Sequence, residues 1–228
     1  MKGKFITFEG GEGSGKTSVI KALREVYPEQ FVFFNDPSST IPECIKIREL
    51  LLSKSYNLSK NAELLLYGAA RAQLAEQIKT NLDNGLNVIC DRYFDSTAVY
   101  QGKLKGHPSF HLQILNSMFC GDLIPDMTIL FDVNAKTGLA RSNSRLSGEN
   151  IDESRWEEMG LEVHKKINFY YREIASMNYD RFRIINSNGL TISEMIEEAT
   201  FFIDDLLLSK DAIQNTKVGY ESVKTQLS

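Results

Sequence analysis

Cysteine, excess positive charge and long apolar runs are all scarce in this sequence, and each shortage argues against a class of protein. Cys44, Cys90 and Cys120 are the 3 cysteines and form no Cys-x-x-Cys pair, so we expect no disulfide framework, no zinc site and a reducing, cytoplasmic setting. The net charge of −4 argues against a protein that binds the phosphate backbone of nucleic acid. The apolar runs fall short of the about 20 residues that cross a bilayer, and no signal-peptide pattern precedes the first strand pattern, so we expect no membrane partner.

The chain has 228 residues, 42% of them hydrophobic, and can bury one substantial core. We expect one domain over residues 1–228, with a polar, loosely ordered tail over 209–228. The predicted strands are 4–8, 31–34, 87–90, 127–132 and 182–185, and the predicted helices are 16–26, 42–53, 60–83, 109–120, 135–144, 156–177 and 191–207. This alternation predicts an α/β fold, a parallel five-stranded sheet flanked by helices on both faces, with ligands bound beyond the carboxyl ends of the strands.

A glycine-rich loop joins the first predicted strand to the first predicted helix. It matches the P-loop pattern G-x-x-x-x-G-K-[ST] through Gly10, Gly15, Lys16 and Thr17. Backbone N–H groups of such a loop surround phosphate oxygens, and the helix N-terminus adds partial positive charge. We therefore predict nucleotide binding rather than a plain glycine-rich turn, with Lys16 at the β- and γ-phosphates and the Thr17 hydroxyl on Mg²⁺. The predicted phosphate-binding residues are Gly10, Gly11, Glu12, Gly13, Ser14, Gly15, Lys16, Thr17 and Ser18.

The third predicted strand ends in Asp91-Arg92-Tyr93. The sequence carries neither the D-x-x-G nor the N-K-x-D motif of G proteins, and an acid followed by a cation replaces the Asp-Glu strand end typical of ATPases. Asp91 would support the water shell of Mg²⁺, and Arg92 would bind a phosphate through its planar fork of donors. The alternative is a surface ion pair at a strand end, which contributes little.

Tyr67 and Arg71 lie four residues apart, on one face of the predicted helix over 60–83. An aromatic ring and a guanidinium placed in this way can stack on a flat base and donate to one of its carbonyl oxygens. The alternative is an ordinary helix with a core tyrosine and a solvated arginine.

Taken together, these motifs resemble those of thymidylate kinases, the P-loop enzymes that phosphorylate dTMP to dTDP. The resemblance runs from residue 4 to about residue 203. It rests on the P-loop segment, Asp36-Pro37-Ser38-Ser39-Thr40, the Tyr67–Arg71 helix, Asp91-Arg92-Tyr93, Ser96-Thr97-Ala98-Val99-Tyr100-Gln101-Gly102, and Pro125-Asp126 before the fourth strand. It implies ATP as the phosphoryl donor, Mg²⁺ as the metal, and a homodimer packed through helices such as 60–83 and 109–120.

The same resemblance implies roles for residues of the acceptor site. Arg48 and Arg92 match arginines that hold the monophosphate, Tyr67 the stacking position, and Arg71 the arginine that donates to a thymine carbonyl. The implied dTMP-binding residues are Glu12, Asp36, Arg48, Tyr67, Arg71, Arg92, Thr97, Tyr100 and Gln101.

Members of this family carry a transition-state arginine either in the P-loop or in a mobile lid. Gly13 stands at the P-loop position, so the resemblance implies the lid design, with a flexible segment over 141–157 and with Arg145 and Arg155 joining Lys16 and Arg92 as catalytic residues. Arg141 is the predicted contact on the adenine side.

Ser38-Ser39 and Ser154 depart from the family pattern, and so do three positions that bear on the choice of base. These are Asn35 before the Asp-Pro pair, Ala70 before Arg71, and the hydroxyl that Tyr67 adds at the stacking position. They leave open a kinase for another nucleotide or for a deoxynucleoside. A P-loop protein that binds ATP as a regulatory signal is the alternative outside enzymes, although it gives Tyr67, Arg71 and Gln101 no role.

Overall fold

Five parallel strands form one sheet in the computed structural model, which describes residues 2–53, 55–146 and 159–208. The strands are β1 (Phe5–Gly10), β2 (Phe31–Asn35), β3 (Asn87–Asp91), β4 (Met127–Asp132) and β5 (Phe182–Asn186). Their order across the sheet is β2-β3-β1-β4-β5, and each neighbouring pair is parallel. The prediction of an α/β fold with a parallel five-stranded sheet is confirmed.

The register of the sheet brings the ends of several strands to one edge. Phe8 of β1 pairs with Asp91 at the end of β3, and Asp91 pairs with Asn35 at the end of β2. Gly10, the last residue of β1, pairs with Phe131 of β4. The P-loop, the Asp36–Thr40 segment and the Asp-Arg-Tyr turn therefore leave the sheet next to one another, at the edge where open α/β sheets bind ligands.

The helices follow the predicted order, with one addition. They are α1 (Lys16–Val26), α2 (Pro42–Leu52), α3 (Lys60–Asp83), α4 (Phe94–Thr97), the π-helix η1 (Ala98–Leu104), α5 (Ser109–Cys120), α6 (Ala135–Leu146), α8 (Gly160–Met177) and a helix over 192–208. The helix predicted from 156 begins at Gly160, and residues 156–158 lie outside the described residues.

The sequence pattern did not predict the helical segment made of α4 and η1. Its β-branched, aromatic and glycine residues have low intrinsic helix propensity. Packing forms it instead, since residues 99–102 are buried and the Glu9 carboxylate accepts a hydrogen bond from the Ser96 N–H. Tertiary contacts commonly override weak local preference in this way.

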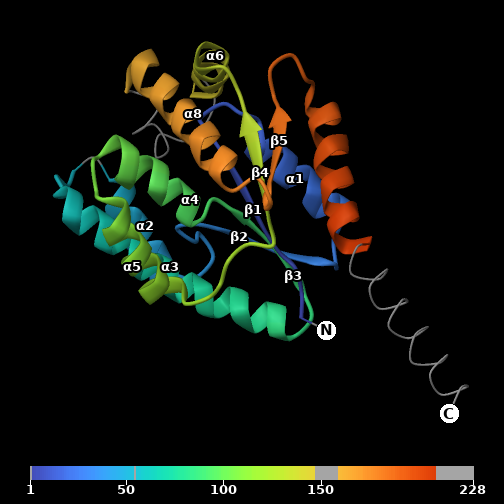
Figure 1. The fold of residues 1–228 in the computed structure, drawn as a ribbon, viewed down its shortest axis with the longest axis horizontal. Coiled ribbons are helices and arrows are strands. Elements are labelled where there is room, and N and C mark those ends of the chain that lie inside the picture. Colours follow the sequence, from blue (N-terminus) through green and yellow to red (C-terminus); the bar gives the residue numbers. More distant parts are fainter. Residues whose placement is uncertain (1, 54, 147–158, 209–228) are drawn as a thin grey trace, which may run out of the picture.

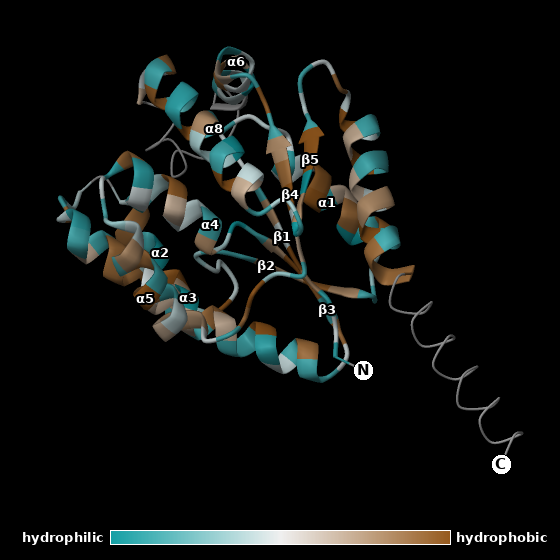
Figure 2. Ribbon diagram, in the orientation of Figure 1, coloured by the Kyte–Doolittle hydropathy of each residue, from teal (hydrophilic) through white to brown (hydrophobic). Residues whose placement is uncertain are grey.

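Helices cover both faces of the sheet (Figure 1), as the sequence predicts. α1 and the helix over 192–208 pack on one face, in a core that includes Ile6 and Phe8 of β1. α2, α3, α5 and α8 lie on the other side (Figure 1), and Phe5 belongs to the core beneath α3. Alternate side chains of β1 therefore point to opposite layers, and the helices carry both hydrophilic and hydrophobic residues along their length (Figure 2). None of the described helices has the length and apolar character that crossing a membrane requires.

Candidate active site

One open pocket lies at the carboxyl edge of the sheet and holds about 1090 Å³ of empty space, its mouth included. The predicted site residues that line it are Gly11, Glu12, Gly13, Ser14, Gly15, Lys16, Thr17, Ser18, Asp36, Arg48, Tyr67, Arg71, Asp91, Arg92, Thr97, Tyr100 and Gln101. Asn35, Pro37, Leu52 and Ser96 complete the lining.

The P-loop backbone comes so close to its neighbours that only glycine fits at two positions. A Cβ on Gly10 would lie 2.7 Å from the carbonyl oxygen of Phe131, and one on Gly13 would lie 1.9 Å from that of Gly138 in α6. Gly13 also has a φ of 67°, a conformation that other residues rarely adopt. An arginine at position 13 would therefore displace the loop. The loop geometry thus agrees with the glycine at this position, where some family members carry an arginine.

Lys16 and Asp91 form an ion pair beneath the P-loop. Lys16 is the first residue of α1, so its side chain lies beside helix N–H groups that have no partner within the helix. Thr17, the next residue, is exposed in the pocket. Within the described ranges no three His, Cys, Asp or Glu side chains gather as a metal cluster. A Mg²⁺ site does not require such a cluster, since the ion keeps several waters and takes one or two carboxylates together with substrate phosphates.

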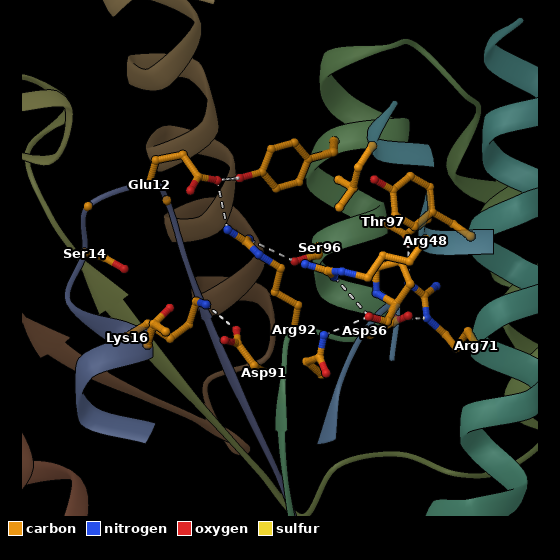
Figure 3. Close-up of a pocket in the computed structure, with 18 of the residues that line it drawn as sticks. Glu12, Ser14, Lys16, Asp36, Arg48, Arg71, Asp91, Arg92, Ser96 and Thr97 are labelled. Carbon is orange, nitrogen blue, oxygen red and sulfur yellow. Dashed lines mark hydrogen bonds and ion pairs between the residues drawn. The ribbon is translucent and has the colours of Figure 1, made fainter. Parts of the chain in front are cut away.

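Arg92 lies in the middle of the pocket, between Lys16 on one side and Asp36 and Arg71 on the other (Figure 3). Its Nη1 donates to the Gly10 carbonyl at 3.1 Å, and its Nη2 donates to Glu12 Oε1 at 2.9 Å. Its backbone has a φ of 68°, which is uncommon for a residue with a side chain.

The buried carboxylate of Glu9 holds the turn that carries Arg92. It accepts hydrogen bonds from the N–H groups of Tyr93 (2.8 Å) and Ser96 (3.2 Å) and from the hydroxyls of Ser96 (2.6 Å) and Tyr171 (3.0 Å). The Ser96 and Tyr171 hydroxyls also accept from Arg92 Nη1, at 3.3 and 3.1 Å. Burial, with a smaller effect of the Asp95 carboxylate, raises the pKa of Glu9 to about 7.

Sequence reasoning missed Glu9 as a functional residue. The residue stands in the Phe-Glu-Gly that opens the P-loop segment, but its partner Tyr171 lies 162 residues further along the chain. An acidic residue in a hydrophobic strand was the one available signal, because buried carboxylates are rare unless they are paired.

Arg71 and Asp36 form a buried ion pair at the end of the pocket away from the P-loop. Arg71 Nε donates to Asp36 Oδ2 at 2.6 Å, and its Nη2 donates to the Thr97 hydroxyl at 2.7 Å. Burial raises the pKa of Asp36, and the Arg71 charge opposes that rise. The other carboxylate oxygen, Oδ1, is buried and has no hydrogen-bond partner among the described residues. Tyr67, one helical turn before Arg71, lines the same end of the pocket.

Two of the departures from the family pattern have structural explanations. Ala70 is fully buried in the core between α2 and α3 and does not line the pocket, so its small side chain does not widen the site. Asn35 does line the pocket, but its side chain forms hydrogen bonds within its own loop. Its Nδ2 donates to the Pro37 carbonyl at 2.8 Å, and its Oδ1 accepts from the N–H and the hydroxyl of Ser39.

Of the three remaining predicted arginines, the structure describes the side chain of Arg141. Arg141 Nη1 donates to the carbonyl of Ser187, in the segment after β5, at 3.2 Å. Arg155 and the side chain of Arg145 lie outside the described residues. Residues 141–146 of the predicted lid segment are the last residues of α6, where the Ser144 hydroxyl donates to the Ala140 carbonyl at 2.6 Å. The mobility of the segment stays a prediction. Residues 147–157 lie outside the described part of the chain.

Comparison with known proteins identifies the family. The family model described as "Thymidylate kinase" matches residues 8–198. The thymidylate kinase of Desulforapulum autotrophicum is 42% identical over 192 residues, which cover 81% of this chain and 84% of the relative. The thymidylate kinase of Syntrophus aciditrophicus is 40% identical, with 80% and 86% covered, and that of Carboxydothermus hydrogenoformans is 42% identical, with 82% and 90% covered. The chain therefore belongs to the thymidylate kinase family.

Proposed function

We propose that this protein transfers the γ-phosphoryl group of ATP to dTMP, which gives ADP and dTDP. One observation carries the proposal: Lys16 of the P-loop and the α3 residues Tyr67 and Arg71 line the same pocket. Arg92 lies between Lys16 and Arg71 (Figure 3). A phosphate donor bound at one end and a nucleotide acceptor bound at the other would meet beside Arg92.

The donor end is formed by the P-loop. Its N–H groups and Lys16 would bind the β- and γ-phosphates of ATP. Lys16 pairs with Asp91 in the structure, so bound phosphates would compete for the lysine and release Asp91. The Thr17 hydroxyl would then hold Mg²⁺ and the released Asp91 would support its water shell; the ion, when bound, would neutralise charge on the transferring group.

The acceptor end fits a nucleoside monophosphate. Arg48, whose Nη1 lies 3.1 Å from the Pro37 carbonyl, and Arg92 supply positive charge for the phosphate of dTMP. Tyr67 supplies a stacking face, and Arg71 supplies a donor for a thymine carbonyl. An unphosphorylated nucleoside would offer Arg48 and Arg92 no phosphate to bind.

The chemical step needs positioning and charge rather than a strong base. A phosphate oxygen of dTMP attacks the γ-phosphorus of ATP, and the bond from that phosphorus to the bridging oxygen of ADP breaks. Charge spreads over the oxygens of the transferring group, where Lys16 and Arg92 stabilise it. None of the described residues that line the pocket is a histidine, in agreement with such a mechanism.

We further propose that the chain is one domain and that it works as a cytoplasmic homodimer. Phe110, Ile114 and Met118 recur every fourth residue on α5 and are 65%, 50% and 68% exposed. Apolar side chains gathered on one helical face in this way are typical of protein interfaces. Leu65 of the neighbouring α3 is 55% exposed. All three cysteines are free and buried, which supports the reducing location.

Product analysis tests the proposed reaction. The protein is incubated with ATP, Mg²⁺ and dTMP, and the nucleotides are identified by mass spectrometry. We expect ADP and dTDP in equal amounts, and no dTMP formed when thymidine replaces dTMP. ADP formed without dTDP would instead favour an ATPase, and ATP binding without turnover would favour the regulatory alternative.

A further inference from the structure

The helix that carries Tyr67 and Arg71 also carries a buried carboxylate that the proposed reaction does not use. Glu63 lies one turn before Tyr67 and two turns before Arg71, so the three side chains share one face of α3. Glu63 is 0% exposed. Burying a carboxylate is costly, and replacing a buried ion pair by apolar groups is often neutral or stabilising. Stability alone is therefore a poor explanation for Glu63.

The contacts of Glu63 lead directly to the base end of the pocket. Its two carboxylate oxygens accept from Lys105 Nζ, each at 2.6 Å, and its Oε1 accepts from Gln101 Nε2 at 3.1 Å. Gln101 is 3% exposed and lines the pocket. Lys105, which directly follows η1, forms an ion pair with Glu63 and donates to both of its oxygens.

An ionised carboxylate only accepts hydrogen bonds, so it determines which end of the Gln101 amide faces it. The amide nitrogen must point toward Glu63, and the amide oxygen is then the group that Gln101 presents on its pocket side. An acceptor at the base matches the ring N3–H of thymine or uracil. Cytosine carries a lone pair at the same ring position and would meet the amide oxygen without a hydrogen bond.

We propose that Glu63 is a positioning residue that sets the base preference of the pocket by orienting the amide of Gln101. The inference rests on the proposed acceptor site. It adds a second reading contact to the Arg71 donor: Arg71 donates to a carbonyl oxygen of the base, and Gln101 accepts from the neighbouring N–H.

The test compares kcat/KM for dTMP, dUMP and dCMP in the full-length protein and in Glu63→Gln. A neutral glutamine at 63 can face Gln101 with either end, which frees the Gln101 amide to turn. We expect the dTMP:dCMP ratio to fall about tenfold, the effect of one mismatched polar contact. The dTMP:dUMP ratio should not change, because both bases carry the N–H. Glu49→Gln is the matched control, since Glu49 forms an exposed pair with Lys46 on α2.

Three further variants separate orientation from a merely structural role. Glu63→Asp keeps a group that only accepts and should keep most of the dTMP:dCMP ratio. Gln101→Leu removes the amide and should lower that ratio about as much as Glu63→Gln does. In the double variant Glu63→Gln/Gln101→Leu the ratio should fall no further than in Gln101→Leu alone.

The inference is overturned if Glu63→Gln has the same dTMP:dCMP ratio as the unmodified protein. It is also overturned if Glu63→Gln lowers this ratio by the same factor in the unmodified protein and in Gln101→Leu. Thermal melting checks that each variant is folded. If Glu63→Gln does not fold, the other two single variants still test the inference. A low dTMP:dCMP ratio in Glu63→Asp would contradict it, and so would an unchanged ratio in Gln101→Leu. An unmodified protein that does not phosphorylate dTMP would refute the proposed function itself, which is a separate outcome.

Discussion

At the scale of single residues, Arg92 connects the two ends of the pocket. Its guanidinium is held by the Gly10 carbonyl and by the Glu12 carboxylate, so its position is set before a ligand arrives. Such preorganisation lowers the cost of aligning a donor with an acceptor phosphate. The motif Asp-Arg-Tyr predicted the residue, but the sequence could not show that Glu9, Ser96 and Tyr171 hold it in place.

Replacing Arg92 should affect the phosphate of the acceptor and not its nucleoside. Arg92→Ala removes a charge-assisted donor, so we expect the Kd of dTMP to rise roughly 30-fold, about 2 kcal/mol. Thymidine, which has no phosphate, should lose little affinity. Isothermal titration calorimetry with both ligands measures this difference. Arg24→Ala is the control. It removes an exposed arginine whose Cζ lies 4.6 Å from the centre of the Phe33 ring and which does not line the pocket. Equal losses for dTMP and thymidine would contradict the phosphate role.

Glu9 predicts a dependence of stability on pH. Its pKa rises from 4.5 to about 7 on folding, so between these values the folded protein binds more protons than the unfolded chain. This contribution to stability is fully present below pH 4.5 and is lost as pH rises through 7. It amounts to about 3 kcal/mol.

The variant Glu9→Gln cannot titrate and should lack this loss. Urea unfolding of both proteins at pH 5 and pH 8 measures the effect. We expect the unmodified protein to lose stability relative to Glu9→Gln between the two pH values. Parallel changes in the two proteins would show that the Glu9 carboxylate titrates near its ordinary pKa.

At the scale of elements, the P-loop and α6 touch through their backbones. A Cβ on Gly138 would lie 2.4 Å from the Glu12 carbonyl oxygen, although Gly138 is no part of the pocket lining. Gly138→Ala should therefore push the P-loop out of place. We expect overpacking to cost about 1–3 kcal/mol of stability and the KM for ATP to rise.

Thermal melting and steady-state kinetics measure these two effects. Lys136→Ala, on an exposed position of the same helix, is the control and should change neither quantity. A Gly138→Ala variant with ordinary stability and KM would show that α6 can move away from the loop without consequence.

Elements with a strong local signal were predictable, and elements formed by packing were not. α1, α3 and α5 have the bounds that the sequence pattern predicts, and α1 in particular carries an apolar stripe at helical spacing, with Val19, Ile20 and Leu23 buried. η1 was missed, since its residues favour helix only when they are buried against α8 and the sheet. The same limit applies to the site: Lys16 and Arg71 belong to recognisable motifs, whereas Glu63 depends on a lysine 42 residues away.

At the scale of the whole molecule, the exposed face of α5 predicts assembly. Phe110, Ile114 and Met118 are arranged on one side of the helix, and burying such a face stabilises a dimer. We expect a dimer mass by light scattering at micromolar concentration. Ile114→Glu should give monomers, while Gln113→Glu, exposed on another side of α5, should not. A monomer mass for the unmodified protein would contradict the proposed assembly.

Acceptor choice by the whole protein tests the central claim most directly. A coupled assay of ADP release, run with ATP, Mg²⁺ and one deoxynucleoside monophosphate at a time, gives kcat/KM for each acceptor. We predict that dTMP is the best acceptor, that dUMP is modestly weaker because it lacks one methyl group, and that dCMP and the purine monophosphates are poor. A higher kcat/KM for dCMP or dGMP than for dTMP would contradict the account.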